Sequence, residues 1–371
     1  MIILFYKKFN NYGGAEKFIL NINKIIKKKY QSILITYYFD EIKFDRPGNL
    51  IKTSNLVSTL KFLKSIKKKN RNIKLISFSG FIDTYIICRF LNIKYNLVYF
   101  SPLSISHDEQ TKFYFPLKSL FFEFIEKQNS HNIDKFYEKK TGLMNFFYYS
   151  AYCIFHYQAI INANYLITMS SYSSKEKKYL YKRNRIKTLS AALFNSEIRD
   201  NFHNDKQKNN KLLCISRLDK HKKIDELIIN IKDVHMDYKL IIIGDGPEKD
   251  YLESIILNYG LSNKVELKGF INENEIDSFI QDCFCFISLD IGDFKISMFD
   301  ALKFGKPVII NKFFVDKEMS LNKFIYFFDN NIGNILKQIS ETNIDKIDYK
   351  NLKFFLKNYS YESFTENLLK L

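Results

Sequence analysis

Twelve short apolar runs, separated by segments with helical periodicity, constrain the fold of this chain more than any other feature. This alternation is typical of α/β proteins with parallel sheets. Several runs are apolar throughout rather than at every second residue, which favours strands covered by helices on both faces. The runs form two sets of six: 2–6, 32–38, 74–79, 96–100, 165–170 and 186–193 in the first half, and 211–216, 239–243, 264–268, 283–289, 307–310 and 324–328 in the second.

The polar segment 199–210 has no large aliphatic residue and separates the two sets of runs as a linker. With 371 residues, the chain is long enough for two domains of ordinary size. We therefore predict an α/β fold of two Rossmann-like, doubly wound domains, residues 1–198 and 211–355, that face each other across a cleft. Residues 356–371 are predicted to form a final helix. Ligands of such sheets bind at the carboxyl ends of the strands, here inside the cleft.

Three signals in the second half, in a fixed order, point to a nucleotide diphosphate. Arg217 follows the run 211–216, and Lys222 lies five residues further on, at a helix entrance. A forked guanidinium and a compact ammonium suit a diphosphate, and they also stabilise negative charge on a leaving group. A solvated basic turn is the alternative, because Lys220 and Lys223 are also present.

The second signal is the turn Gly244-Asp245-Gly246-Pro247, directly after the run 239–243. Glycine permits positive φ angles and a close approach of the backbone, and proline starts the next helix well. The third signal is Asp300 in a helical segment, whose carboxylate can accept hydrogen bonds from ribose hydroxyls. The glycine turn is a weak signal alone, and its place about 25 residues after Arg217 makes it more specific.

This set of residues resembles the nucleotide-sugar domain of family 4 glycosyltransferases, which have the GT-B fold. The spacing of Arg217 and Lys222 matches the family pattern, and Tyr359-Ser360-Tyr361 resembles the start of the family's final helix, which crosses back to the first domain. The resemblance implies sugar transfer from a nucleotide-diphosphate donor, with retention of configuration and without a metal ion or other cofactor. The chain contains no Asp-x-Asp motif, which agrees with metal independence.

The chain departs from the family pattern at one position. The family has two glutamates here with seven residues between them; the second corresponds to Asp300 and the first falls on Gly292. The neighbouring Asp290 or Asp293 is recruited by a local shift, the donor sugar is held differently, or catalysis is weak or absent. The resemblance also implies that backbone amides of three further residues line the donor pocket, with core packing as their alternative role: Phe294, Ile296 and Ser297.

In the first half, Gly13-Gly14-Ala15-Glu16 opens a helix that we expect to run to about Lys29. Free amides at a helix N-terminus form an anion site, and the motif resembles the family's loop whose second glycine faces the donor phosphate. A glycine pair before a helix is also common without any function. His107 lies where the family often has a histidine near the donor sugar and the acceptor, where it can bind the sugar or move a proton. A surface loop histidine is its alternative.

Charge is distributed unevenly. Residues 1–190 carry 32 Lys and Arg against 12 Asp and Glu, whereas the remainder carries 25 against 28. A basic half favours an anionic partner, either membrane head groups or nucleic acid. The lysine clusters Lys27–Lys29 and Lys67–Lys69 fit such a surface, although lysines at helix C-termini also favour the helix dipole. The aromatic segment 113–124 either reaches a membrane interface or forms a core helix.

The remaining sequence features indicate the cellular compartment in which the protein is expected. The five cysteines include no Cys-x-x-Cys pair, so buried free thiols in a reducing compartment are expected rather than a metal site. No stretch of 18 uncharged apolar residues occurs, and the first residues read as a strand rather than a signal peptide. We expect a cytoplasmic protein, soluble or peripheral on the inner face of the membrane.

The sequence thus predicts a retaining glycosyltransferase that moves a sugar from a nucleotide sugar to a saccharide or lipid-linked acceptor, in cell-envelope or surface polysaccharide synthesis. A catalytically impaired sugar-nucleotide-binding subunit is the main alternative, because of Gly292. A phosphorylase of the same fold would need a lysine-anchored cofactor, for which the sequence shows no signature. A nucleic-acid-binding protein would explain the charge but not the set of Arg217, Lys222 and Asp300, so no nucleic acid partner is expected.

Overall fold

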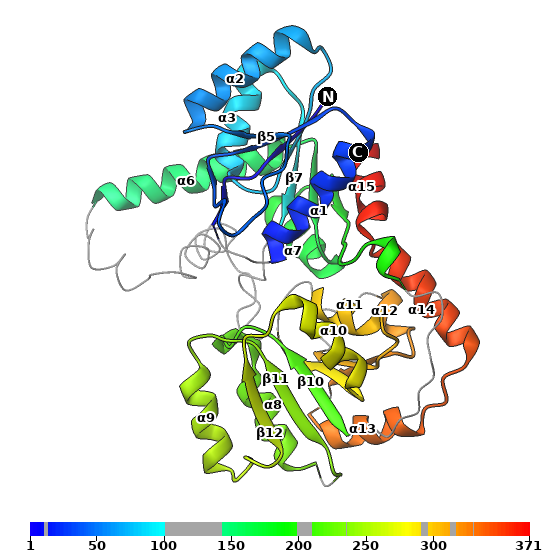
Figure 1. Cartoon of the computed structure of the whole chain (residues 1–371). Coiled ribbons are helices and arrows are strands. Elements are labelled where there is room, and N and C mark those ends of the chain that lie inside the picture. Colours follow the sequence, from blue (N-terminus) through cyan, green and yellow to red (C-terminus); the bar gives the residue numbers. More distant parts are fainter. Residues whose placement is uncertain are drawn as a thin grey trace. The chain divides into compact units, whose positions relative to one another are not determined.

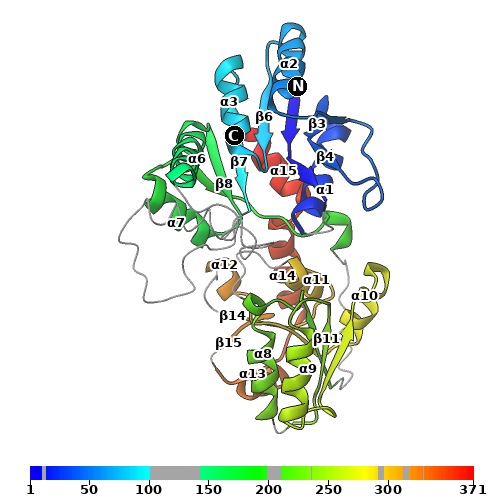
Figure 2. The ribbon, with the colours of Figure 1, turned by 90° about the vertical axis from the view of Figure 1, so that its left-hand side faces the viewer.

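The computed structural model describes residues 1–10, 14–100, 143–198, 210–234, 236–290, 296–311, 317–328 and 330–371. The chain divides into two compact units. The first consists of Met1–Ser190 together with Thr365–Leu371, and the second of Ala191–Phe364. Each is an α/β unit in which helices pack against a parallel sheet (Figure 1, Figure 2).

The first unit is built on a seven-stranded sheet in the order β5-β3-β1-β6-β7-β8-β9, with every neighbouring pair parallel. At its centre, Leu4 lies opposite Leu34 on one side and Ile76 on the other, and all three are fully buried. The strands are β1 (Ile2–Phe5), β3 (Ser32–Thr36), β5 (Leu50–Lys52), β6 (Lys74–Ser77), β7 (Tyr95–Tyr99), β8 (Tyr165–Thr168) and β9 (Ile186–Thr188). A separate parallel pair consists of β2 (Lys8–Phe9) and β4 (Tyr38–Phe39).

Helices cover both faces of this sheet because each has one apolar stripe. The described helices that lie entirely in this unit are α1 (Gly14–Lys29), α2 (Leu56–Lys69), α3 (Phe81–Leu91), α6 (Leu143–Asn162) and α7 (Ser171–Tyr181). Residues of α2, α3 and α6 share one hydrophobic cluster with Ile3 and Phe5 of the central strand. The helix α1 lies beside α15 (Tyr361–Lys370), where Lys29 forms an ion pair with Glu366 at 3.7 Å (Figure 1).

The second unit has a six-stranded parallel sheet in the order β12-β11-β10-β13-β14-β15. Leu212 and Cys214 of β10 belong to one hydrophobic cluster and Leu213 belongs to the other, because successive strand residues point to opposite faces. Both faces are therefore buried, which explains why the runs are continuously apolar. The strands are β10 (Lys211–Ile215), β11 (Lys239–Ile243), β12 (Val265–Gly269), β13 (Cys285–Ser288), β14 (Val308–Asn311) and β15 (Ile325–Phe328).

The described helical segments of the second unit connect these strands and continue to the chain's end. They are η1 (Asn195–Glu197), η2 (Lys220–Lys222), α8 (Ile224–Lys232), α9 (Lys249–Asn258), α10 (Glu273–Asp282), α11 (Ile296–Leu302), α12 (Lys317–Ser320), α13 (Ile332–Glu341) and α14 (Lys346–Asn358), followed by α15. Asp345 starts α14 with a capping box, in which its side chain accepts from the amide of Asp348 at 2.8 Å. Among the helices of the described ranges, none is both long and apolar enough to span a membrane.

The end of the chain takes part in both units. Ala192 donates to the carbonyl of Tyr359 at 2.9 Å within the second unit. The last seven residues belong to the first unit, where Lys74 donates to the carbonyl of Leu369 at 2.9 Å. Residues 356–371, predicted as one final helix, comprise the end of α14 and the whole of α15. The predicted linker 199–210 lies outside the described residues except for Asn210.

The predicted α/β fold with two sets of parallel strands is confirmed. Each of the twelve apolar runs overlaps a strand. The last run of the first set is a strand only over Ile186–Thr188, and the first unit ends two residues later, at Ser190. Three short strands were not predicted, because β2 and β4 have two residues each and β5 has three. The placement of the two units across a cleft stays a prediction.

Candidate functional site

In the second unit, the carboxyl ends of β11, β10 and β13 lie next to one another, because these parallel strands are neighbours in the sheet. The three loops that leave them, together with the helix α11, carry most of the described candidate residues. Such an edge is where ligands bind in doubly wound sheets. The sequence motifs that are far apart in the chain therefore meet at one side of this unit.

Arg217 is two residues beyond the end of β10. Its side chain is 67% exposed, and its guanidinium contacts the carboxylate of Asp219 at 3.1 Å. An exposed pair of this kind contributes about 1 kcal/mol or less, so it does not commit the guanidinium to one position. Arg217 thus presents an exposed fork of hydrogen-bond donors at this edge of the sheet.

The glycine turn after β11 packs directly on the loop that carries Arg217. Gly244 has a φ of 141°, and a Cβ there would lie 1.9 Å from the carbonyl oxygen of Ser216. A Cβ on Gly246 would lie 2.5 Å from the carbonyl oxygen of Leu218. Leu218 also donates to the carbonyl of Asp245 at 3.1 Å. The two loops are thus joined backbone to backbone, which only glycine permits at these positions.

Lys222 is held by a carboxylate. Its ammonium lies 3.0 Å from Asp290, which follows β13, and the side chains are 24% and 10% exposed. The hydroxyl of Ser288 donates to the other oxygen of Asp290 at 3.1 Å. Asp290 was one of two acids considered as a replacement at Gly292. The structure brings it to the predicted phosphate cation, Lys222, rather than leaving its carboxylate open.

Asp300 lies in the middle of α11, the helix that follows the loop after β13. The start of this helix therefore lies at the same edge as the loops above. Asp300 is partly exposed, and Lys303 lies 3.5 Å from its carboxylate and 3.3 Å from that of Asp277. Burial opposes the charge of Lys303, yet the nearby carboxylates raise the pKa of this lysine above its ordinary value. Asp300 thus lies within a charge network and still has solvent access.

The other predicted donor residues are only partly described. Ile296 and Ser297 form the first turn of α11, and both are half-buried. Gly292, Asp293 and Phe294 lie outside the described residues. The donor contact of the backbone amides of Ile296 and Ser297 stays a prediction.

In the first unit, Gly14 is the first residue of α1 and is exposed, whereas Gly13 lies outside the described residues. Glu16, in the first turn, is buried and accepts a hydrogen bond of 3.0 Å from the hydroxyl of Tyr6. Burial raises the pKa of Glu16. Hydrogen bonds from the backbone and from the hydroxyl of Tyr6 lower it, but burial has the larger effect. Glu16 is thus a buried carboxyl in the first turn of α1, and its environment disfavours the charged form. His107 lies outside the described residues.

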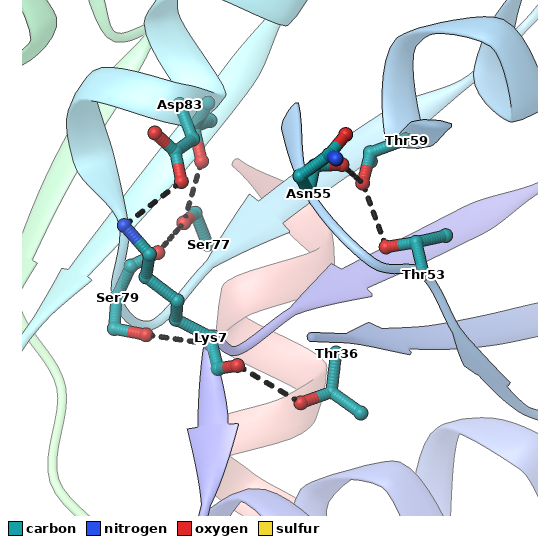
Figure 3. A network of polar contacts seen from close by, with 9 residues as sticks. Lys7, Thr36, Thr53, Asn55, Thr59, Ser77, Ser79 and Asp83 are labelled. Atoms are coloured by element: carbon teal, nitrogen blue, oxygen red, sulfur yellow. Dashed lines mark hydrogen bonds and ion pairs between the residues drawn. The ribbon is translucent and has the colours of Figure 1, made fainter. Parts of the chain in front are cut away.

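A cavity of about 590 Å³ opens at the carboxyl edge of the first sheet. Lys7, two residues beyond the end of β1, forms an ion pair of 3.1 Å with Asp83 in the first turn of α3 (Figure 3). The backbone of Lys7 is fixed as well, because its amide donates to Ser79 and its carbonyl accepts from Thr36 (Figure 3). This network orients one cation and one anion at the cavity wall.

Aromatic rings form much of the rest of that wall. His156 of α6 is almost fully buried and stacks on Phe81 and Tyr152, each with ring centroids 5.9 Å apart. On another side, Phe78 stacks on Phe100 at 5.9 Å. A cavity with flat apolar walls and a few charged groups suits a small organic ligand such as a sugar ring. Sequence reasoning missed Lys7, Asp83 and His156.

Lys7 and Asp83 could have been predicted as candidates from their positions just after two strands that are neighbours in the sheet. Lys7 comes after β1 and Asp83 comes after β6, and these strands pair in the sheet. The sequence does not say that two strands separated by some 70 residues are neighbours. His156 gives no such signal, because it lies inside a long helix.

The described cysteines are structural. Cys88, Cys214, Cys283 and Cys285 are buried free thiols, as expected. Burial raises the pKa of Cys214 to about 12. Such thiols are poor nucleophiles and poor metal ligands. Over the same described ranges, no three His, Cys, Asp or Glu side chains are placed to hold a metal ion.

Comparison with known families decides what the second unit resembles. Residues 195–356 match the family model of glycosyl transferases group 1. This group 1 match covers Arg217, Lys222, Gly244 and Asp300, so the edge described above belongs to the matched region. None of the curated proteins compared with the chain matches it.

Solved structures show the same fold over the whole chain. Anabaena HepE, in complex with UDP, is 16% identical with a TM-score of 0.70, over 100% of this chain and 99% of its own. A glycosyltransferase from Rickettsia africae is 14% identical with a TM-score of 0.71, over 100% and 97%. Sucrose-phosphate synthase from Thermosynechococcus elongatus is 12% identical with a TM-score of 0.70, over 100% and 97%. The chain thus has two Rossmann-like units, as GT-B glycosyltransferases do.

Proposed function

We propose that this protein transfers a sugar from a nucleotide-diphosphate sugar to the hydroxyl of an acceptor. The observation that carries the proposal is the convergence of Arg217, Lys222 and the Gly244 turn at one sheet edge, inside the region that matches glycosyl transferases group 1. Structures of Anabaena HepE contain UDP, UDP and glucose, or UDP-glucose. A uridine diphosphate sugar is therefore the first donor to test.

In this proposal the two cations bind the diphosphate. Arg217 is exposed and able to swing, so it forms a bidentate contact with phosphate oxygens. Lys222 supplies a second charge from a fixed position beside Asp290. Both stabilise the negative charge that develops on the leaving nucleoside diphosphate, and this stabilisation accelerates the transfer. The amides at the start of α11 add uncharged donors, and the resemblance to family 4 assigns such a role to Gly14 as well.

The finer features rest on the resemblance to family 4. These are retention of configuration, independence of metal ions, a ribose contact from Asp300, and donor or acceptor contacts from Gly13, His107, Asp293 and Phe294. Arg217 and Lys222 supply the positive charge that a metal ion would otherwise provide. No cofactor other than the donor substrate is proposed.

The acceptor is proposed to bind in the first unit, at the cavity beside Lys7 and Asp83. Aromatic faces stack on the apolar face of a sugar ring, and the ion pair forms hydrogen bonds with its hydroxyls. A saccharide or lipid-linked saccharide fits this chemistry. Two similar structures are a lipopolysaccharide outer core galactosyltransferase, WaaB, and WaaG, a glycosyltransferase involved in lipopolysaccharide biosynthesis. They support a role in envelope or surface polysaccharide synthesis, in the cytoplasm or at the inner face of the membrane.

A panel of UDP- and GDP-sugars tests the proposal. The purified protein is titrated with each sugar nucleotide by calorimetry, and release of the nucleoside diphosphate is then followed with simple glycosides as acceptors. The expected result is micromolar to millimolar binding of one sugar nucleotide and acceptor-dependent release of its diphosphate. If no member of the panel binds, the proposal is wrong.

One observation favours a second candidate, a subunit that binds sugar nucleotides without transferring sugar. The family's first glutamate is replaced by Gly292, and the neighbouring Asp290 is already paired with Lys222. Donor binding without release of diphosphate, across many acceptors, would support this candidate. Acceptor-dependent turnover would exclude it.

A further inference from the structure

A second cavity, of about 690 Å³, opens at the other edge of the first sheet, where strands begin rather than end. Tyr95 is the first residue of β7, Asn164 directly precedes β8, and Arg185 directly precedes β9. These strands are parallel neighbours, so their amino ends meet at one edge. The cavity beside Lys7 lies at the carboxyl edge of the same sheet. The second cavity is therefore separate from the proposed chemistry.

Four cationic side chains line this second cavity, and none of its lining residues is acidic: Lys94, Lys182, Arg183 and Arg185. Three helices, α3, α6 and α7, also end near this edge, because helices of such units run antiparallel to the strands. Lysine and arginine often compensate the partial negative charge of helix C-termini. The cations that already bind helix ends must therefore be told apart from those that remain for a ligand.

One of the four cavity cations, and one lysine outside the cavity, bind helix ends. The guanidinium of Arg183 donates to the carbonyls of Ile160, Ala163 and Asn164 at the end of α6. Lys67 donates to the carbonyls of Leu91 and Asn92 at the end of α3. Arg183 is thus fixed as one wall of the cavity.

The other three cavity cations form no such hydrogen bonds within the described ranges. In the part of the chain that the structure describes, the side chains of Lys94, Lys182 and Arg185 form no ion pair or hydrogen bond. All three are exposed at the cavity mouth. Burial lowers the pKa of Arg183, Tyr95 acts in the opposite direction, and the like charge of Arg185 lowers it further.

We propose that this cavity binds a phosphate-bearing anion. Arginine and lysine are the side chains best suited to phosphate oxygens, and here one rigid guanidinium is surrounded by three cations that are able to move onto a ligand. The volume exceeds what inorganic phosphate needs and admits a phosphorylated head group or a sugar phosphate. The anion comes either from an anionic lipid at a membrane surface or from a soluble phosphate ester.

The test compares two double variants that each remove two positive charges from the first unit. Lys94→Gln with Arg185→Gln removes cations of the cavity. Lys61→Gln with Arg71→Gln removes one exposed lysine and one exposed arginine outside it, and serves as the matched control. Each protein is sedimented with vesicles of phosphatidylglycerol or of phosphatidylcholine, and is titrated separately with glycerol phosphate.

The cavity variant should lose about tenfold or more in affinity, because each cation near an anionic surface contributes a factor of about five, whereas the control should change little. Loss with phosphatidylglycerol vesicles alone assigns a lipid head group as the ligand. Loss with glycerol phosphate assigns a soluble ester. The proposal would be overturned if the cavity variant and the control had equal affinities both for the vesicles and for glycerol phosphate. It would also be overturned if the unmodified protein bound neither.

Two further readouts keep the result interpretable. Binding of the donor nucleotide should be the same in both variants, so a failure of the proposed glycosyltransferase function does not decide this test. If thermal unfolding shows that the double variant is not folded, Lys94→Gln alone replaces it, because this exposed side chain forms no described contact.

Discussion

The ammonium of Lys222 lies 3.0 Å from a carboxylate oxygen of Asp290, although 68 positions separate the two residues in the chain. The pair is well shielded from solvent, so water screens it less than a surface ion pair. Asp290 is also fixed by the hydroxyl of Ser288. A donor diphosphate would therefore meet an ammonium that already has an anionic partner.

Asp290→Asn should strengthen UDP binding, by roughly three- to tenfold. The substitution removes one negative charge close to the proposed diphosphate position and releases Lys222 for phosphate oxygens. Calorimetric titration of both proteins with UDP measures the change. Asp250→Asn, an exposed acid at the start of α9, is the matched control and should leave UDP affinity unaltered. Weaker UDP binding by Asp290→Asn would instead mean that the carboxylate positions the ammonium for its ligand.

Arg217→Ala should lower turnover by about two orders of magnitude, because the guanidinium stabilises charge on the leaving group. The exposed Lys220 lies in the same turn, and Lys220→Ala removes one positive charge there without removing the fork of donors. That control should keep turnover within about threefold of the unmodified protein. Initial rates at saturating donor measure the turnover of both variants and of the unmodified protein. Nearly normal turnover in Arg217→Ala would exclude its proposed part in catalysis.

The strands could be predicted from the sequence because burial on both faces leaves a continuous apolar run, as at Leu240–Ile243 of β11. The edge strand β5 could not be predicted, since three residues are too few to show a pattern of apolar residues. The loops with Arg217 and Gly244 were predicted as candidates from local spacing. Their contact through Ser216 was not, because the order of strands in the sheet is a tertiary property.

Ion pairs between residues far apart in the chain could not be predicted from the sequence for the same reason. Asp290 was considered only as a substitute for a missing glutamate, whereas the structure pairs it with Lys222. Lys7 and Asp83 meet only because β1 and β6 are adjacent. Local chemistry thus predicted which residue types matter, and topology decided their partners.

Gly244→Ala should destabilise the second unit by several kcal/mol, because the new Cβ would overlap the carbonyl oxygen of Ser216 at a φ of 141°. Gly260 also has a positive φ, of 64°, but nothing lies within 4 Å of a Cβ there. Gly260→Ala is therefore the control and should cost only about 1–2 kcal/mol. Urea unfolding compares the two. Equal losses would show that the joined loops contribute nothing beyond backbone conformation.

Glu16→Gln should raise the melting temperature near neutral pH but not in acid. Burial raises the pKa of Glu16 above its ordinary value of 4.5, so the native state holds a proton that the unfolded chain releases between these two pKa values. The stabilisation by protonated Glu16 is complete below pH 4.5 and is lost as pH rises through the native pKa. Glutamine stays neutral throughout and still accepts the hydrogen bond from Tyr6.

Melting temperatures of both proteins between pH 4 and pH 8 measure this difference, which should grow with pH. Tyr6→Phe provides the control, because the hydroxyl of Tyr6 lowers the pKa of Glu16. Its removal should move the loss of stability to a higher pH in the protein that keeps Glu16. A difference between Glu16→Gln and the unmodified protein that is constant or shrinks with pH would show that Glu16 is not protonated more easily in the folded state.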